Sequence, residues 1–372
     1  MNDDTLEMRC ISCWVLSRYS AWLFESDYEH CHTLFHSSLV ALCGRLLDTM
    51  PKAQAAACSA LCILSEIACD ELVPYLNDIF TIIQRCFPVY GVKSTMHLID
   101  LIGTIADSVG NDLAVPELSV LYLPYLIHRL RVTEDNDMYI FPILECLTSV
   151  TSAAGLEMLP YTSELINRCL HIINNTIQSN QAVEEGNMIE DDAPVKDFAI
   201  CCIDVLAGLC EGLGEKFTEY MNDNNSNTLI NLILTCAQDQ LADLRQSAVL
   251  LIGELVKSTP TVLPIHTIQT RVIDIILANL ADGDEHPAVC SNAIWALGEV
   301  IIRYGGTLVE GYLGRVTNIL IHLMQQSQCS HTLRQNIGIT FGRLALTNTK
   351  TVRQIDVLCM LCILFLLLFP LQ

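Results

Sequence analysis

The sequence is short of basic residues. Only 20 of its 372 residues are lysine or arginine, whereas 42 are aspartate or glutamate, so the formal net charge at pH 7 is -22. Because a surface of this sign repels phosphate, the composition argues against direct binding of nucleic acid. It favours instead a partner that is itself basic.

Catalytic and nucleotide-binding motifs are also missing. The sequence contains no glycine-rich phosphate loop, no nucleophile elbow and no HExxH motif. Two Cys-x-x-Cys pairs, beginning at Cys10 and Cys359, lie at opposite ends of the chain, and the histidines around Cys31 suit the surface of a helix start better than a metal site. We therefore predict a protein that is not an enzyme and that uses neither a cofactor nor a metal.

No secretory leader is expected, because no apolar segment precedes the first helical pattern. The 18 cysteines lie within apolar helical segments, which indicates reduced, buried side chains rather than a disulfide framework. Residues 357–371 are almost purely apolar, but this segment is shorter than the roughly 20 residues that a membrane span needs. We expect a protein of the cytosol or nucleus without a membrane anchor.

Aromatic residues make up only 6% of the chain, while leucine, isoleucine, alanine and cysteine are abundant, which favours helices packing on helices. A small residue recurs at the same place in successive apolar helical segments. Its positions are Ser17, Ser65, Gly103, Thr148, Ala207, Gly253, Gly298 and Gly342. Six of the seven intervals lie in or close to the range of about 40 to 47 residues that is typical of a two-helix HEAT repeat.

This period predicts an all-α fold, a HEAT-repeat solenoid in which antiparallel helix pairs stack into a superhelical array. The helix with the small residue is here called the reference helix of its pair. Glycine at mid-helix costs about 1 kcal/mol relative to alanine, so its use at Gly253 and Gly298 predicts close packing of neighbouring helices. Prolines such as Pro74, Pro124 and Pro160 are expected to open the first helices of the pairs.

The repeats divide the chain into three regions. Residues 1–30 are expected to form an incomplete first repeat with a reference helix only, residues 31–350 the HEAT-repeat array, and residues 351–372 an apolar, atypical tail. The one long interval contains the segment 183–197, with six acidic residues and no apolar periodicity. This segment is interpreted as an acidic loop, either a solvated insertion or a competitor for a basic ligand.

Three positions of each reference helix form one stripe: three before the small residue, one after it and four after it. Eight acidic residues and two tryptophans fall on this stripe. They are Trp14, Glu66, Asp100, Asp107, Glu145, Asp204, Glu211, Glu254, Trp295 and Glu299. Unpaired carboxylates are costly to bury, so we expect the stripe to face water on the concave side of the solenoid.

A stripe of carboxylates with interspersed tryptophans suits a basic, partly apolar, extended peptide. Carboxylates bind lysine and arginine, whereas tryptophan binds aliphatic stems, rings or guanidinium faces and is common among binding hot spots. Two alternatives stay open. The acids could serve solubility alone, and the tryptophans could simply pack against a neighbouring repeat.

Several segments spread over residues 8–346 have a distinctive sequence. They are Ile11–Tyr19, Ala56–Ala60, Glu71–Leu76, Ile102–Gly110, Leu206–Gly214, Val249–Leu255 and Asn292–Glu299. Together these segments closely resemble the transportin family of β-karyopherins. The resemblance implies a HEAT-repeat nuclear import receptor of cytoplasm and nucleus that binds basic proline-tyrosine nuclear localisation signals of cargo proteins, many of them RNA-binding, with nucleoporins as further partners.

The resemblance also implies which residues bind cargo. They are Ile11, Trp14, Glu66, Asp100, Asp107, Asp204, Glu211, Glu254 and Trp295, where Glu254 replaces an aspartate of the family. The family's N-terminal repeats, which bind the Ran GTPase, and its long acidic loop are not found in this chain, and the likeness stops near Thr347. The rival interpretation is a HEAT-repeat structural scaffold for protein assembly without a signal-peptide site.

Overall fold

The computed structural model describes residues 3–25, 31–189, 193–259, 261–281, 286–305, 310–325 and 330–347. Throughout these ranges the regular elements are helices and none is a strand, which confirms the predicted all-α class. No helix in the same ranges is long and apolar enough to cross a membrane. The predicted apolar tail, 351–372, lies outside the described residues, as do residues 190–192 of the predicted acidic loop.

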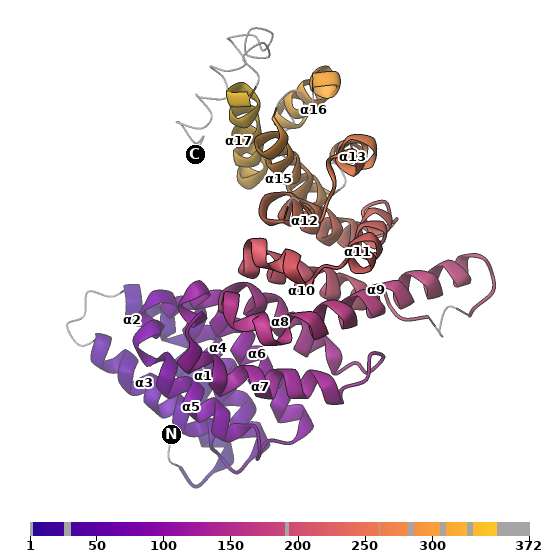
Figure 1. Ribbon diagram of the computed structural model, residues 1–372. Helices are drawn as coiled ribbons and strands as arrows, with labels where there is room; N and C mark the ends of the chain where they lie inside the picture. The colour runs from indigo at the N-terminus through magenta and orange to yellow at the C-terminus, as the bar shows by residue number, and fades with distance from the viewer. Residues whose placement is uncertain are drawn as a thin grey trace. The chain divides into compact units, whose positions relative to one another are not determined.

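The chain forms two compact units. The first comprises Met1–Ile166 together with Glu211–Leu213. Its helices are α1 (Leu6–Arg18), α2 (Ser20–Glu25), α3 (Cys31–Leu46), α4 (Pro51–Ala68), η1 (Cys69–Tyr75), α5 (Leu76–Cys86), α6 (Val92–Val109), η2 (Gly110–Leu113), α7 (Pro116–Val132), α8 (Ile140–Ala154) and η3 (Gly155–Tyr161) (Figure 1). First helices and reference helices alternate along the chain, as the repeat predicts.

The second unit comprises Asn167–Cys210 and Gly214–Gln372. The helices from this part of the chain are α9 (Thr162–Glu184), α10 (Asp197–Leu213), η5 (Gly214–Tyr220), α11 (Asp223–Cys236), α12 (Ala242–Ser258), α13 (Ile265–Thr267), the π-helical turn η6 (Ile268–Val272), α14 (Ile273–Ala281), α15 (Pro287–Tyr304), η7 (Glu310–Tyr312), α16 (Leu313–Gln325) and α17 (His331–Thr347). The helix pairs continue here with the same alternation.

Within each unit the reference helices pack directly on one another. In the first unit α1 packs on α4, α4 on α6 and α6 on α8, and in the second α12 packs on α15 and α15 on α17 (Figure 1). A Cβ atom added to Gly103 of α6 would lie 3.2 Å from the Cα atom of Cys146 on α8, which is tighter than ordinary contact. The small residue of the repeat therefore permits a close approach of helices, as the sequence predicted.

Four of the reference helices end in the same kind of turn. The residue that follows the helix has a positive φ, 43° at Cys69, 53° at Gly110, 53° at Gly155 and 55° at Gly214. Glycine adopts this conformation without steric cost, and among the described non-glycine residues Cys69 alone does so. Each turn begins a short 3-10 segment that leads to the first helix of the next pair.

Of the three prolines that were predicted to open helices, two do so and one does not. Pro74 and Pro160 lie within the 3-10 segments η1 and η3, just before α5 and α9, which agrees with a role in starting those helices. Pro124, however, lies inside α7, whose first turn contains Pro116. Burial of Leu123 and neighbouring apolar side chains of α7 maintains the helix although Pro124 cannot donate a backbone hydrogen bond.

A buried carboxylate joins three helices at the start of the first unit. Asp48 follows α3, and its side chain accepts hydrogen bonds from Arg9 Nε at 2.9 Å, Arg45 Nη1 at 2.8 Å and the Met50 backbone N–H at 2.9 Å. Burial raises the pKa of Asp48, but the Met50 N–H and the two guanidinium groups outweigh this effect and lower the pKa below its ordinary value. Asp48 thus connects α1 to the turn between α3 and α4.

We expect Asp48→Asn to lower the free energy of unfolding of the first unit by about 3 kcal/mol, because it removes one partner of a buried ion-pair cluster. Since the folded pKa lies below the unfolded value, this stability is present above the unfolded pKa and is lost as the pH falls through the folded one. Thermal unfolding at pH 7 and pH 3 measures both effects. The exposed Asp70→Asn is the control, and equal changes in the two variants would contradict the prediction.

Candidate functional site

Six of the predicted cargo-binding residues lie in the first unit, and all of them are exposed. Ile11 and Trp14 on α1 are 53% and 58% exposed. We define the N-terminal acidic surface as these two residues together with the four exposed acids Glu66, Asp100, Asp107 and Glu211. In this unit the prediction that the stripe faces water is confirmed.

Contacts between helices show that the stripe positions lie side by side. The Cys62 thiol, three residues before the small residue of α4, lies 4.0 Å from Asp100 Oδ2, at the same position of α6. The Ser152 hydroxyl, four residues after the small residue of α8, donates to Glu211 Oε2 at 3.0 Å, and Glu211 occupies the same position of α10. The register deduced from the sequence is therefore also the register of the packed helices.

Trp14 shares its exposed indole with a cation of the same helix. The guanidinium carbon of Arg18 lies 5.4 Å from the centroid of the Trp14 ring, within the range of a cation–π interaction. The two residues are four apart on α1, a spacing that places their side chains on one face. A ligand that uses this face of Trp14 must displace Arg18 or lie beside it.

The second tryptophan of the stripe sits against a neighbouring helix. The ring of Trp295 on α15 lies over Gly253 of α12, so closely that a Cβ atom at Gly253 would clash with the ring. Lys257 Nζ is 5.9 Å from the ring centroid and 3.3 Å from both carboxylate oxygens of Glu254. We call Gly253, Glu254, Lys257 and Trp295 the Trp295 cluster. Trp295 is half-buried, so it packs on the preceding repeat and still exposes part of its indole.

Two stripe acids do not face water. Glu254 and Glu299 are each only 7% exposed, so the prediction of exposed carboxylates is wrong at these positions. Glu254 pairs with Lys257 on its own helix, and Glu299 Oε1 lies 2.8 Å from Arg343 Nη1 on α17. The paired cations offset the cost of burial, which an unpaired carboxylate could not bear.

Asp204 on α10 is neither fully exposed, like the acids of the first unit, nor buried in an ion pair, like Glu254 and Glu299. It is half-buried, and burial raises its pKa to about 6, an effect that a hydrogen bond with the Ser247 hydroxyl partly opposes. At pH 7 Asp204 is therefore mostly ionised, although its desolvation disfavours the charge. It can supply a negative charge to a basic ligand at neutral pH and loses that charge under mildly acidic conditions.

The buried cysteines agree with the prediction of small hydrophobic side chains. Burial raises the pKa of Cys13 to about 11 and those of Cys43 and Cys62 to about 12, so these thiols stay protonated at neutral pH. Within the part of the chain that the structure describes, no group of three or more His, Cys, Asp or Glu side chains is placed to hold a metal ion.

Two cations approach the tryptophans, and neither contact was predicted from the sequence. Arg18 follows Trp14 by four residues on one helix, so that spacing was a usable signal. Lys257 reaches Trp295 from another helix, and its spacing from Trp295 in the sequence contains no such signal. Only the packing of α12 on α15 brings the two together.

Comparisons with known proteins place the chain in a wider context. No protein-family model matches it. Transportin-1 of human is 35% identical over 347 residues, and transportin-1 of rice is 32% identical over 352 residues; each alignment covers 92% of this chain. Importin subunit beta-2 of fission yeast is 29% identical over 352 residues. The chain spans about 37% of the length of human transportin-1.

Solved structures show the same architecture. A crystal structure of importin beta matches 93% of this chain and 41% of its own with a TM-score of 0.66 at 14% sequence identity. A structure of yeast importin-beta, Kap95p, matches 95% of this chain and 40% of its own with a TM-score of 0.55 at 14% identity. Fold and structural likeness thus define a HEAT-repeat array of the importin beta kind.

Within that class, the sequence likeness is to the transportins. The chain is homologous to a segment of transportin-1 over 92% of its own length. The predicted fold class and the predicted resemblance are therefore both confirmed.

Gly253→Ala is expected to lower the melting temperature, because the added methyl group forces the Trp295 ring away from α12 and overpacking of this kind costs roughly 1 to 3 kcal/mol. The matched control is Gly342→Ala, where an added Cβ meets nothing within 4 Å and helix propensity gains about 1 kcal/mol. Thermal unfolding of both variants decides the point. A rise in melting temperature in both would show that the close contact does not constrain the helices.

Asp204→Asn should raise the melting temperature at pH 8 and change it little at pH 4. The folded pKa of Asp204, about 6, lies above the unfolded value, so its stabilising contribution is present below about pH 4 and is lost as the pH rises through 6. The accumulated difference is roughly 2 to 3 kcal/mol. The exposed Asp107→Asn serves as control, and a pH-independent effect of Asp204→Asn would contradict the assignment.

Proposed function

We propose that this chain is part of a nuclear import receptor that binds basic proline-tyrosine nuclear localisation signals of cargo proteins. The observation that carries the proposal is the N-terminal acidic surface, where exposed carboxylates on the reference helices α4, α6 and α10 accompany the exposed side chains of Trp14 and Ile11. Homology to transportin-1 over 92% of the chain supports the same function. The proposed protein works in cytoplasm and nucleus.

The proposed mechanism is binding without catalysis. Carboxylates of Glu66, Asp100 and Asp107 neutralise lysine and arginine side chains of the signal through charge-assisted hydrogen bonds. Ile11 and Trp14 bury aliphatic or aromatic parts of the same peptide. In the second unit the partly exposed indole of Trp295 and the half-buried carboxylate of Asp204 are the groups proposed to bind the peptide.

Further partners follow from the structural neighbours. One structure of Kap95p contains Ran in its GDP form, and another contains the nucleoporin Nup1. By analogy we propose that the whole receptor to which this chain belongs uses a Ran GTPase and nucleoporins. These partners are proposed for the whole receptor, since the chain spans only about 37% of human transportin-1.

The two tryptophans provide the direct test. We expect Trp14→Ala and Trp295→Ala each to weaken binding of a labelled basic peptide ending in Pro-Tyr by about 30-fold, the effect of losing a hot spot of about 2 kcal/mol. Fluorescence anisotropy measures the affinity. The matched control is Trp22→Ala, since Trp22 is 44% exposed and lies off the stripe. Unchanged affinity in the Trp14→Ala/Trp295→Ala double variant would overturn the proposal.

The same titration separates the proposal from a structural scaffold without a signal-peptide site. Binding through several carboxylates weakens steeply when the salt concentration rises, because the ions screen the exposed charges. A scaffold contact through the first helices of the pairs has no reason to do so. Affinity that does not change between low and high salt would favour the scaffold.

A further inference from the structure

A polar pocket of about 330 Å³ lies in the second unit, away from the stripe. It is lined by the end of α9, the segment before α10, the end of α11, the turn between α11 and α12, and the beginning of α12. Its lining residues are Thr176, Ile177, Asn180, Gln181, Glu184, Lys196, Thr235, Gln238, Asp239, Gln240 and Leu244. The volume is near the lower limit for ligand sites, about 300 Å³, and therefore suits a single side chain rather than a large cofactor.

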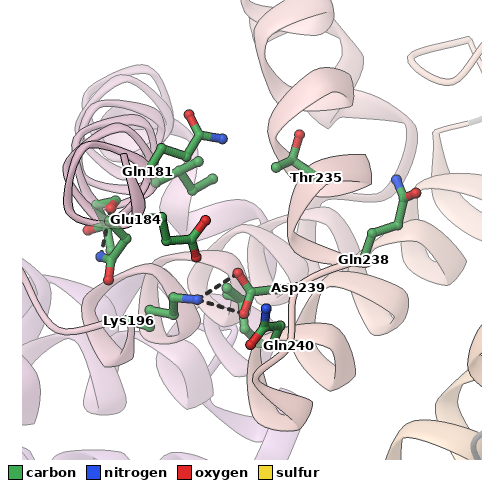
Figure 2. A pocket seen from close by; sticks show the side chains of 11 residues that line it. Gln181, Glu184, Lys196, Thr235, Gln238, Asp239 and Gln240 are labelled. Carbon is green, nitrogen blue, oxygen red and sulfur yellow. Dashed lines mark hydrogen bonds and ion pairs between the residues drawn. The ribbon is translucent and has the colours of Figure 1, made fainter. Parts of the chain in front are cut away.

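Several hydrogen-bond donors of this pocket are already used inside the protein. Lys196 Nζ donates to both carboxylate oxygens of Asp239, each at 2.8 Å (Figure 2). Asn180 Nδ2 donates to the carbonyl oxygens of Thr176 at 2.9 Å and Pro194 at 3.0 Å. Gln238 Nε2 donates to the Leu234 carbonyl at 2.7 Å. These contacts fix the amide orientations, so the side-chain oxygens of Asn180 and Gln238 remain as acceptors.

Two polar groups of the lining, the Glu184 carboxylate and the Thr176 hydroxyl, have no partner among the described residues. The Glu184 carboxylate extends from α9 toward Lys196 and Asp239, and within the described residues it forms no hydrogen bond or ion pair (Figure 2). The hydroxyl of Thr176, a residue only 1% exposed, also has no partner among the residues that the structure describes. One lysine against two carboxylates leaves the lining with a net negative charge. An anion is therefore repelled, and a ligand with donors and positive charge is favoured.

We propose that this pocket binds the side chain of an arginine from a basic segment of a partner protein. A guanidinium group offers five N–H donors and no acceptor, which complements the free Glu184 carboxylate and the side-chain oxygens of Asn180 and Gln238. Its planar fork can contact the Glu184 carboxylate through two parallel hydrogen bonds. The aliphatic side chains of Ile177 and Leu244 are available to the arginine stem. The site lies outside the stripe and does not depend on the function proposed for it.

The probe is a fluorescein-labelled Gly-Ser peptide with three spaced arginines, titrated by anisotropy into the full chain carrying Trp14→Ala and Asp100→Asn. This background weakens the N-terminal acidic surface, so binding there does not mask the pocket. We expect Glu184→Gln to weaken binding of the probe about tenfold, the effect of losing a charge-assisted contact. A peptide with citrulline in place of arginine keeps the shape without the charge and should bind as weakly.

Glu185→Gln is the matched control, because Glu185 is the next residue, carries the same charge and does not line the pocket. It should change the affinity less than about twofold, the effect of one distant exposed charge. Thr176→Val should also weaken binding of the probe without lowering the melting temperature, since the Thr176 hydroxyl has no partner among the described residues. Equal effects of Glu184→Gln and Glu185→Gln, or equal binding of the citrulline peptide, would overturn the proposal.

Restoring Trp14 and Asp100 distinguishes this proposal from the one for the stripe. If the stripe does not bind basic peptides, the restored chain binds the probe as the background variant does, and the effect of Glu184→Gln persists. If instead the pocket is inactive, Glu184→Gln has no effect in either chain. That second result would overturn the proposal for the pocket and leave the proposal for the stripe unaffected.

Discussion

The close approach of consecutive reference helices is the constraint on which the other features of the structure depend. A small residue at mid-helix removes the side chain that would hold the next helix away, as Gly103 does for Cys146 and Gly253 does for Trp295. The same contacts place one stripe position beside its equivalent on the following helix. Packing and ligand-facing surface therefore share one register, and a change at the small residue alters both.

Pairing with cations decides which carboxylates of the stripe are available to a ligand. Glu66 and Asp100 stay exposed in the first unit, whereas Glu254 and Glu299 are buried in ion pairs with Lys257 and Arg343. The paired cations offset the cost of burying these two acids. The stripe therefore contains exposed acids, the half-buried Asp204 and two buried acids that are paired with cations.

Both stripe tryptophans are approached by a cation of the chain itself. Arg18 lies over Trp14, and Lys257 lies near Trp295 while it pairs with Glu254. These contacts are the ones that a lysine or arginine of a bound peptide would make. In the free protein, Arg18 and Lys257 therefore already occupy part of the binding surface of these tryptophans. A basic ligand that binds there replaces a cation of the protein with one of its own. Specificity for a particular peptide must then come from parts of the peptide other than its lysine and arginine side chains.

The sequence by itself determined the all-α repeat, its register and the exposed half of the stripe, because small residues, apolar periodicity and charge recur at fixed local spacings. It also indicated the likeness to transportins. Only the tertiary structure decided which acids are buried, where Lys257 lies and that Thr176, Glu184 and Lys196 line one pocket. The reason is physical. A spacing within one helix fixes a face, whereas pairing across helices depends on how side chains from distant segments pack.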